Sequence, residues 1–339
     1  MSGARAILVT GGAGYIGAHT AKALAEAGYR PVVYDDLSAG HVEAVRWGEL
    51  VRGDIRDTAA LTAAMTAHGA EAVVHFAGLI SVAESVRRPD LFYDVNVDGT
   101  RSVLSAMLDA GVGRIVFSSS AAVYGNAPSG ADGVIPEDNP KAPASPYGDT
   151  KLVGELAIEA YCRAFGLSGV ALRYFNASGA DASGLIGEAH DPETHLIPLA
   201  VDAAMGRRGP LTLFGADYPT PDGTCVRDYI HVTDLAEAHV AAVKLGLDAG
   251  AFRAFNVGTG QGFSVRQIID AVTRAAGRAV PSVVGPRRPG DPASLVADVR
   301  RARADLGWRP SRSGLDEIVG SAVAWHSSPA YGRRDPPRA

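Results

Sequence analysis

The sequence predicts an α/β protein: a doubly wound parallel sheet with a smaller, loop-rich C-terminal domain. Three observations lead to this fold class. Short apolar runs rich in β-branched residues alternate with Ala-rich stretches of helical spacing, and the first run ends in a glycine-rich turn. After residue 176 the composition changes to Gly, Pro, Asp and Thr. Alternating strands and helices are typical of a parallel sheet that right-handed crossovers cover on both faces.

The predicted strands are the apolar runs, because a strand buried on both faces reads as a continuous apolar segment. In chain order they are 5–10, 30–36, 71–78, 114–120, 169–176 and 252–258. Helices are predicted between and after them at 15–27, 57–68, 91–110, 149–165 and 264–276, and Gly28 can close the first helix.

The composition argues against several classes of protein. A net charge of −5, from 32 basic and 37 acidic residues, carries no signature of a nucleic-acid or membrane-surface binder. The N-terminus enters a strand almost at once, which leaves no room for a signal peptide, and no apolar run is long enough to span a bilayer. Cys162 and Cys225 are far apart, which predicts a reducing compartment and a cytoplasmic location.

The glycine-rich turn, VTGGAGYIGAHT, follows the first predicted strand and opens the first helix. Gly11, Gly14 and Gly17 have the spacing G-x-x-G-x-x-G. Such glycines permit a tight turn, let backbone N–H groups approach a pyrophosphate, and let helix and strand pack closely. An ordinary Gly-rich turn is the alternative, but strand, turn and helix stand in the order that dinucleotide binding needs.

Asp35 ends the second predicted strand, about 20 residues after the glycine turn, where dinucleotide-binding proteins carry an acidic residue. A carboxylate there accepts hydrogen bonds from the adenosine ribose hydroxyls, and together with Asp36 it repels a 2′-phosphate. We therefore predict NAD in preference to NADP or FAD. A solvated turn residue is the alternative interpretation of Asp35.

Tyr147 and Lys151, in the segment SPYGDTK, are spaced i, i+4, so both face one side of a helix. A nearby ammonium stabilises a phenolate and lowers the pKa of the phenol, which would make Tyr147 a base. Ser118, Ser119 and Ser120 end the fourth predicted strand, at the edge where doubly wound sheets bind ligands. The alternatives are a surface tyrosine stacked on a lysine stem and a serine that only caps a helix.

A longer series of motifs completes the pattern. In order along the chain stand TGGAGYIG, YDDLS, GDIRD, FAG, FSSSAAVYG, SPYGDTK, LRYFNASGA, GLIGE, FGADYPTPDGTCVRDYIHV, NVGTGQGFS and RRPGD. From about residue 5 to 310 the chain resembles the UDP-glucose 4-epimerases, which are extended short-chain dehydrogenase/reductase enzymes.

The resemblance implies an activity. Tyr147 would remove the proton of the sugar 4-hydroxyl while hydride passes from C4 to a tightly bound NAD. The 4-keto sugar would then rotate and take hydride and proton back on its other face. Ser120 would hydrogen-bond the sugar O4, and Lys151 would tune Tyr147 and bind the nicotinamide ribose. UDP-glucose and UDP-galactose are thereby interconverted, in galactose metabolism.

The resemblance also implies binding residues. For NAD it adds, to the three glycines, Asp35, Asp36, Tyr147 and Lys151, the residues Tyr15, Ile16, Leu37, Asp54, Ile55, Phe76, Ala77, Gly78, Asn96 and Phe175. For the UDP-sugar it implies Ser120, Asn176, His195, Leu196, Phe214, Arg227, Arg288, Asp291 and Leu295.

Three positions depart from the patterns of relatives. Ile80 stands where some relatives place a lysine near the cofactor phosphates. Thr194 and His195 stand where some have paired amides. Leu295 takes the position that flanks the sugar 2-substituent, where tyrosine disfavours N-acetylhexosamines and a small residue admits them. Acceptance of UDP-N-acetylglucosamine therefore stays open.

The domain organisation follows from the same pattern. We expect an NAD-binding Rossmann domain at 1–176, with further sheet and helix segments from about 232–276. A UDP-sugar-binding domain is expected at about 177–231 and 277–326, and residues 327–339 are expected to be a disordered tail. The family usually forms homodimers through two helices per subunit, which here are 91–110 and 149–165.

Several alternatives were weighed. The segment HDPETH offers His190 and His195 as metal ligands, but it lacks helical histidine spacing and supporting cysteines, so no metal is predicted. Ala121 and Ala122 replace the acidic pair of sugar-nucleotide 4,6-dehydratases, which argues against dehydration. A UDP-pentose or UDP-uronate 4-epimerase stays open. Two further interpretations remain. One is a non-catalytic NAD-binding module, and the other is an ordinary dehydrogenase, which would consume free NAD.

Overall fold

The computed structural model describes residues 4–125, 133–288 and 291–331. Its centre is a seven-stranded sheet in the order β11-β6-β5-β4-β1-β2-β3, and every neighbouring pair of strands in it is parallel. The strands are β1 (Ala6–Thr10), β2 (Arg30–Asp35), β3 (Glu49–Arg52), β4 (Ala70–His75), β5 (Arg114–Ser120), β6 (Ser168–Tyr174) and β11 (Phe252–Val257). The predicted fold class is confirmed.

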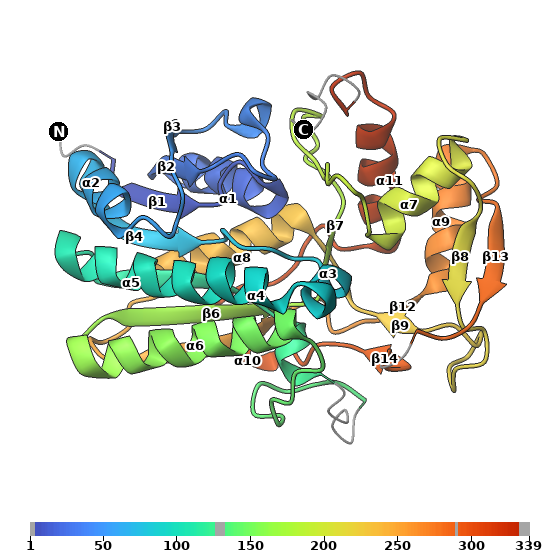
Figure 1. The fold of residues 1–339 in the computed structure, drawn as a ribbon. Coiled ribbons are helices and arrows are strands. Elements are labelled where there is room, and N and C mark those ends of the chain that lie inside the picture. Colours follow the sequence, from blue (N-terminus) through green and yellow to red (C-terminus); the bar gives the residue numbers. More distant parts are fainter. Residues whose placement is uncertain (1–3, 126–132, 289–290, 332–339) are drawn as a thin grey trace.

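Helices cover both faces of this sheet, with α2, α5 and α6 in front and α1 and α8 behind (Figure 1). Their bounds are α1 (Tyr15–Glu26), α2 (Thr58–His68), α5 (Gly99–Ala110), α6 (Pro146–Phe165) and α8 (Val232–Lys244). Side chains alternate along each strand. Ile7 and Val9 therefore pack with the α8 side, and Leu8 between them packs with α2 and α5.

The predicted helix at 91–110 is interrupted. A short α4 (Pro89–Phe92) passes into a π-helical turn, η2 (Tyr93–Asp98), before α5 begins. Wider turns of this kind often occur at functional sites. Here the π-helical turn places Asn96, which is buried, against the loop that follows β4. Periodicity alone does not reveal such a turn, because the side chains on either side of it keep a helical pattern.

The predicted strands 71–78 and 169–176 both end earlier than expected. β4 ends at His75, so Phe76, Ala77 and Gly78 form a loop at the edge of the sheet. β6 ends at Tyr174, and Asn176 starts a new strand, β7 (Asn176–Ser178), that pairs with β10 (Tyr229–His231). The first change leaves Phe76, Ala77 and Gly78 on a loop, and the second leaves Phe175 between two strands and moves Asn176 into β7.

A second group of elements lies beside the sheet (Figure 1). Its helices α7 (Leu196–Ala204), α9 (Val265–Ala276) and α11 (Leu315–His326) share one hydrophobic core. Its strands are β8 (Leu211–Phe214), β9 (Val226–Arg227), β12 (Phe263–Ser264), β13 (Ser282–Gly285) and β14 (Ser294–Leu295). α9 had been grouped with the sheet domain, but its Ile268, Ala271 and Val272 pack with α7 and α11.

Shorter elements connect these parts: α3 (Val82–Arg87), α10 (Arg300–Asp305), η1 (Val42–Ala44) and η3 (Ala121–Tyr124). Of the expected tail at 327–339, residues 332–339 lie outside the described residues. In the described part, the Tyr331 ring contacts the rings of Trp325 and His326. Among the described helices, none combines the length and apolar character that crossing a membrane requires.

Candidate active site

The glycine turn between β1 and α1 is too crowded for side chains at two of its positions. Gly11 has φ 71°, and a Cβ there would lie 2.6 Å from the Ala77 nitrogen. A Cβ on Gly17 would lie 2.2 Å from the Gly11 oxygen. By contrast, a Cβ on Gly14 would meet only the Gly11 oxygen, at 3.3 Å, so Gly14 borders open space.

That open space lies at the start of α1. Gly14 is the N-cap residue, no side chain caps the helix, and its first turn holds no acidic residue. Uncapped N–H groups at a helix N-terminus attract anions. A narrow turn with one open side and free N–H donors fits the pyrophosphate of a dinucleotide. Behind the turn, Ile16 packs against the sheet core and Tyr15 donates a hydrogen bond to the Gly179 oxygen at 2.7 Å.

Asp35 lies beside this turn, as predicted. Its carboxylate accepts hydrogen bonds from the Ala13 nitrogen at 3.0 Å and the Leu37 nitrogen at 2.9 Å. Burial raises the pKa of Asp35, and these two backbone hydrogen bonds oppose the rise. A carboxylate has about four lone-pair sites, so others remain for ribose hydroxyls. Leu37, with φ 63°, turns the chain sharply after β2.

Three other residues predicted for NAD are already engaged within the protein. Asp36 accepts hydrogen bonds from Ser38, so its carboxylate closes its own turn. Asp54 is ion-paired with Arg56 at 2.5 Å, while Ile55 beside it is buried. The Asn96 side chain accepts a hydrogen bond from the Leu79 nitrogen at 2.7 Å. These contacts shape the walls of the site, and binding roles for the three residues stay predictions.

The loop after β4 is held in place by Asn96. Gly78 has φ 157°, and a Cβ there would lie 2.9 Å from the Asn96 side-chain oxygen. Asn96 also donates to the Thr150 hydroxyl at 3.0 Å, which ties this loop to α6. The Phe76 ring packs 4.6 Å from the His239 ring of α8. Phe175 packs instead against the cluster around η3.

Tyr147 and Lys151 stand one turn apart at the start of α6, which confirms the spacing expected of a helix. The Ser145 hydroxyl caps this helix, and Pro146 occupies its first turn. The Lys151 Nζ lies 5.9 Å from the centroid of the Tyr147 ring and donates a hydrogen bond to the Ser118 oxygen at 2.8 Å. Lys151 is thereby held between the helix and β5.

The structure distinguishes the three serines at the end of β5. Ser118 is hydrogen-bonded to the Tyr174 hydroxyl, and Ser119 donates to Glu155 at 2.5 Å. Ser120 is the serine that hydrogen-bonds the Tyr147 side chain. Its hydroxyl also accepts from the Ala122 nitrogen at 3.1 Å, so the capping role that was the alternative coexists with this contact.

Burial dominates the electrostatics of this pair. It raises the pKa of Tyr147, and the hydrogen bond with Ser120 only partly opposes the rise. Burial also lowers the pKa of Lys151 to about 8. The expectation that Lys151 gives Tyr147 a lowered pKa is therefore wrong for the polypeptide alone. The physical reason is that removing both groups from water disfavours both charged forms.

The residues predicted for UDP meet in the second group of elements. Arg227 on β9 is ion-paired with Asp291 at 2.7 Å. The parallel pairing of β9 and β14 sets Leu295 opposite Arg227. The guanidinium of Arg288 lies 4.0 Å from the centroid of the half-exposed Phe214 ring. Asn176 is far from Arg227 in sequence but close to it in the fold. Its backbone nitrogen donates a hydrogen bond at 3.0 Å to the oxygen of Asp228, the residue after Arg227.

His195 and Leu196 begin α7, where Leu196 packs on the α7–α9–α11 core. His195 is hydrogen-bonded to Glu188, and His190 and Glu193 lie in the same cluster. Burial would raise the pKa of Glu188, but His195 and His190 lower it to about 2. The sequence interpretation considered His190 and His195 alone, and the two glutamates complete a group that it missed.

Asp228 is a further residue that the sequence reasoning missed. Its buried carboxylate accepts from the Thr259 nitrogen and hydroxyl, and from the nitrogens of Gly260 and Ala297. A Cβ on Gly258 would lie 2.5 Å from this carboxylate. Asp228 therefore fixes the NVGTG loop next to Arg227. The available signal was an acidic residue directly before the apolar Tyr229 and Ile230, followed later by a Gly-Thr-Gly segment.

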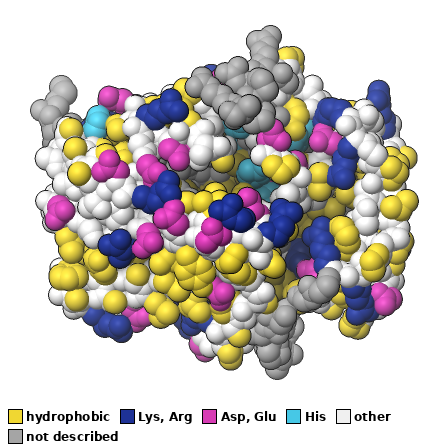
Figure 2. Space-filling model, viewed as in Figure 1, with side chains coloured by type: hydrophobic (Ala, Val, Ile, Leu, Met, Phe, Trp, Pro, Cys, Tyr) yellow, Lys and Arg dark blue, Asp and Glu magenta, His cyan; other side chains and the backbone are white. Residues whose placement is uncertain are grey.

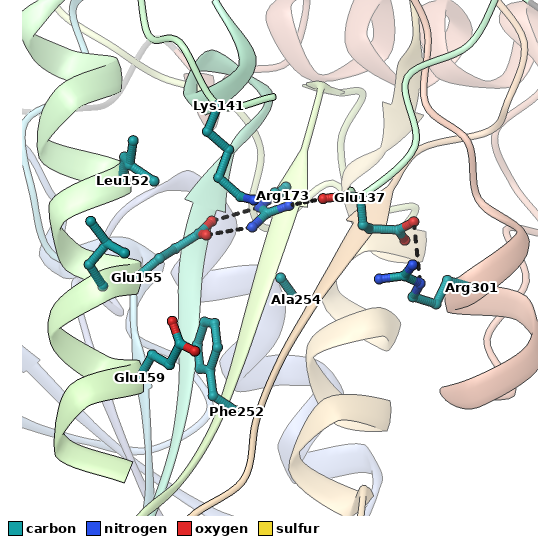
Figure 3. A pocket seen from close by; sticks show the side chains of 10 residues that line it. Glu137, Lys141, Leu152, Glu155, Glu159, Arg173, Phe252, Ala254 and Arg301 are labelled. Atoms are coloured by element: carbon teal, nitrogen blue, oxygen red, sulfur yellow. Dashed lines mark hydrogen bonds and ion pairs between the residues drawn. The ribbon is translucent and has the colours of Figure 1, made fainter. Parts of the chain in front are cut away.

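A hollow of about 270 Å³ lies away from these residues, between α6, β6 and β11 (Figure 3). Glu155 and Arg173 form an ion pair at 2.6 Å on its wall, with both side chains 3% exposed. Arg173 also donates to the Glu137 oxygen and the Tyr124 hydroxyl. The charged and polar groups on this wall hydrogen-bond one another and form a structural network. The hollow is therefore not part of the candidate site.

Comparisons with known proteins agree with this geometry. Residues 7–258 match the model of the NAD dependent epimerase/dehydratase family. The UDP-glucose 4-epimerase of Rhizobium meliloti is 52% identical over 323 residues, which covers 95% of this chain and 97% of that protein. That of Halalkalibacterium halodurans is 46% identical over 327 residues, covering 96% of this chain and 97% of that protein.

Solved structures give the same result. The crystal structure of UDP-glucose 4-epimerase from Brucella ovis in complex with NAD superposes with a TM-score of 0.92 at 51% identity, covering 98% of this chain and 99% of that one. The enzyme from Bifidobacterium longum, in complex with NAD⁺ and UDP, superposes with a TM-score of 0.90 at 37% identity, covering 96% of this chain and 99% of that one.

Proposed function

Because this chain belongs to the NAD dependent epimerase/dehydratase family, we propose that it is a UDP-glucose 4-epimerase that interconverts UDP-glucose and UDP-galactose with NAD as its cofactor. One observation of the site carries the proposal. The Tyr147 side chain is hydrogen-bonded to Ser120, with Lys151 one turn further on, at the same sheet edge as the glycine turn.

The residues present fit NAD. The open side of Gly14 and the uncapped start of α1 suit a pyrophosphate, and Asp35 suits the adenosine ribose. When bound, NAD supplies the acceptor and later the donor of a hydride at the sugar C4. Lys151, with its pKa near 8, stays largely protonated at neutral pH and can bind the second ribose.

The chain's own residues handle the proton. Ionised Tyr147 accepts the proton of the 4-hydroxyl and returns it to O4 when C4 is reduced again, so the protein ends unchanged. Ser120 holds O4 through its hydroxyl. Because burial disfavours the phenolate, Tyr147 depends on positive charge close by, and Lys151 is the protein group that stands nearest in the helix.

Inversion at C4 needs an anchor that leaves the sugar free to turn. We assign the anchor to Arg227 and Arg288, because guanidinium groups bind phosphate oxygens in a bidentate manner. Asp291 accepts a hydrogen bond from the Arg227 guanidinium and so fixes the direction in which the Arg227 side chain points. Leu295 on β14 pairs with Arg227 and packs against the η3 cluster that follows Ser120, which suits contact with the sugar. Asn176, His195 and Leu196 stay predicted substrate contacts.

A homodimer through α5 and α6 is also part of the proposal. Leu156 and Phe165 on α6 are 55% and 58% exposed, and Tyr93, at the start of η2, is exposed as well. Figure 2 shows a band of hydrophobic side chains over this face of the molecule. Contiguous apolar surface of this kind marks interaction sites. The cytoplasmic location stays a prediction.

The test is direct. Purified protein is incubated with UDP-galactose, without added nicotinamide cofactor or reductant, and the nucleotide sugars are separated by anion-exchange chromatography. We expect UDP-glucose to form without net production of reduced cofactor. A parallel panel of UDP-N-acetylglucosamine, a UDP-pentose and a UDP-uronate measures how far Leu295 restricts the sugar. Absence of hexose conversion together with turnover of another panel member would overturn the proposed substrate.

A further inference from the structure

Four potential metal ligands converge in the segment that precedes α7. Glu188, His190, Glu193 and His195 each offer one oxygen or nitrogen atom, and these atoms all lie within 4.8 Å of one another. The segment stands between the sheet domain and α7, away from Tyr147 in sequence. No step assigned above to Tyr147, Ser120 or Lys151 uses this cluster.

Three of the distances between donor atoms approach those of a tetrahedral site, and a fourth contact, between Glu188 and the His195 Nδ1, is a direct hydrogen bond. Zinc binds imidazole nitrogen and carboxylate oxygen at about 2.0–2.2 Å, so the donors around a tetrahedral ion stand about 3.4 Å apart. The Glu188 oxygen lies 3.3 Å from the His190 Nδ1. The Glu193 oxygen lies 3.7 Å from the His190 Nδ1 and 3.9 Å from the His195 Nδ1. Small movements would bring all four onto one ion.

The two glutamates of the cluster are buried, its histidines are more exposed, and its hydrogen bonding is incomplete. The side chains of Glu188 and Glu193 are only 4% and 8% exposed. One oxygen of Glu193 and the Nδ1 of His190 are buried and make no hydrogen bond within the described chain. Buried polar atoms in native proteins normally have partners, so the free Glu193 oxygen points to a ligand, whereas the His190 Nδ1 lies 3.3 Å from the Glu188 oxygen.

Contacts from outside the cluster hold its backbone in place. The Trp325 indole of α11 donates to the Glu188 carbonyl oxygen at 2.7 Å, and His41 bonds the Ala189 oxygen at 2.8 Å. The Glu193 oxygen that lies 3.7 Å from His190 also accepts from the backbone nitrogens of Thr194 and His195, and the other oxygen of Glu193 is the one without a partner. Such supporting contacts orient ligands in metal sites. The cluster is therefore a built arrangement rather than a chance meeting of surface side chains.

We propose that Glu188, His190, Glu193 and His195 bind one divalent transition-metal ion of the Zn²⁺ type. Two neutral imidazoles and two carboxylates balance the charge of such an ion. Four protein ligands also fill a tetrahedral coordination sphere, as in structural zinc sites, so His195 would bind the ion instead of making the substrate contact predicted for it. The ion would stabilise the fold, because it joins the start of α7 to the backbone of Glu188 and Ala189, which Trp325 and His41 already hydrogen-bond.

No metal is expected from the sequence, because HDPETH lacks supporting cysteines and helical histidine spacing. Neither is needed here, because the turn between Glu188 and His195 brings nitrogen and oxygen donors to one point. The proposal is independent of the epimerase proposal. A protein that epimerises UDP-galactose can fail this test, and a protein that binds zinc can fail the other.

The experiment uses the full chain with any affinity tag removed. The protein is dialysed against a chelator, reloaded with ZnSO₄ and passed over a desalting column, and its metal content is measured by mass spectrometry. We expect one zinc per chain, and a rise in melting temperature on loading because the ion binds only the folded state. Cobalt loading should give the strong visible absorption of a tetrahedral site.

Matched variants locate the ion. Glu193→Gln is nearly isosteric, and His190→Asn removes a nitrogen ligand; each should weaken zinc binding by at least about 100-fold in competition with a chromophoric chelator, since loss of supporting residues alone costs 10–100-fold. His68→Asn is the control, because His68 also faces a carboxylate, at 3.8 Å, but lies outside the cluster. Its affinity should equal that of the unaltered protein.

Either of two results would overturn the proposal. The first is that the unaltered protein retains no more zinc than Glu193→Gln, in which case the cluster is a histidine–glutamate hydrogen-bond network. The second is stoichiometric zinc that both variants retain, which would place the ion elsewhere. Because the first comparison needs only the unaltered protein and a near-isosteric variant, misfolding of His190→Asn would not remove the test.

Discussion

Replacing Tyr147 with phenylalanine tests the assignment of the base. The change removes one hydroxyl, which is hydrogen-bonded to Ser120, and leaves the ring in place. A positioned general base contributes about 10²- to 10⁴-fold in rate. On the transition-state scale this corresponds to about 3–5 kcal/mol. We therefore expect kcat for UDP-galactose to fall by that factor while the melting temperature changes little, since Ser120 keeps its contact with the Ala122 nitrogen.

The assay couples formation of UDP-glucose to a UDP-glucose dehydrogenase and follows the reduced cofactor that the coupling enzyme makes. Tyr161→Phe is the control, because it makes the same change on the same helix, α6. Bound NAD, released by denaturation, should be equal in both variants. Unaltered protein should gain kcat/KM as pH rises, because Tyr147 must be ionised to accept a proton and burial raises its pKa. Undiminished turnover in Tyr147→Phe would refute the assignment.

Three further predictions concern the scaffold. Gly17→Ala places a Cβ 2.2 Å from a backbone oxygen of the glycine turn, so the purified variant should carry little NAD. Gly320→Ala is the control, because its Cβ meets nothing within 4 Å and the variant should carry the normal amount. Equal NAD content in the two variants would contradict the packing argument. Glu155→Gln leaves a buried arginine unpaired and should lower the free energy of unfolding in urea by about 3–5 kcal/mol. Glu159→Gln, at a more exposed pair, should lower it by less than about 1 kcal/mol, and similar losses in both would refute the burial argument. Burial lowers the pKa of Lys151 from 10.5 to about 8, so the unfolded chain binds more protons between these values and the stability of nucleotide-free protein should rise with pH from about 8 to 10.5. Lys151→Met should remove this rise, and it should stabilise the nucleotide-free protein at pH 7 by up to about 3 kcal/mol while lowering activity. If the free energy of unfolding of the variant kept the same pH dependence, Lys151 would not be its source.

The sheet and its glycine turn follow from local patterns. Each predicted strand of the central sheet appears, because a run such as that from Ala6 to Thr10 has few alternatives to a strand buried on both faces. β3 was not predicted, since its residues Glu49–Arg52 are mixed and only partly buried at the edge of the sheet. The π-helical turn at Tyr93–Asp98 was missed for a different reason, because its periodicity is nearly that of an α-helix.

The candidate site divides in the same way. The i, i+4 spacing of Tyr147 and Lys151 is a local property of a helix and was predictable. The residue pattern alone left the three serines open and only the family resemblance indicated Ser120, because the choice depends on which serine faces Tyr147 and which faces the buried Glu155, both on α6. The direction of the Tyr147 pKa was also out of reach, since desolvation depends on every segment that covers the side chain.

By itself the sequence determined the order of strands and helices, the dinucleotide turn and the motifs that identify the family, because steric limits on glycine and the periods of buried side chains act over short stretches of chain. The tertiary structure decided where distant segments meet. The pairing of β9 with β14 brings Arg227 to Asp291, and the fold of the 188–195 segment gathers two histidines and two glutamates around one point. Burial and charge at those meeting points depend on contacts across the whole chain, and no local pattern encodes them.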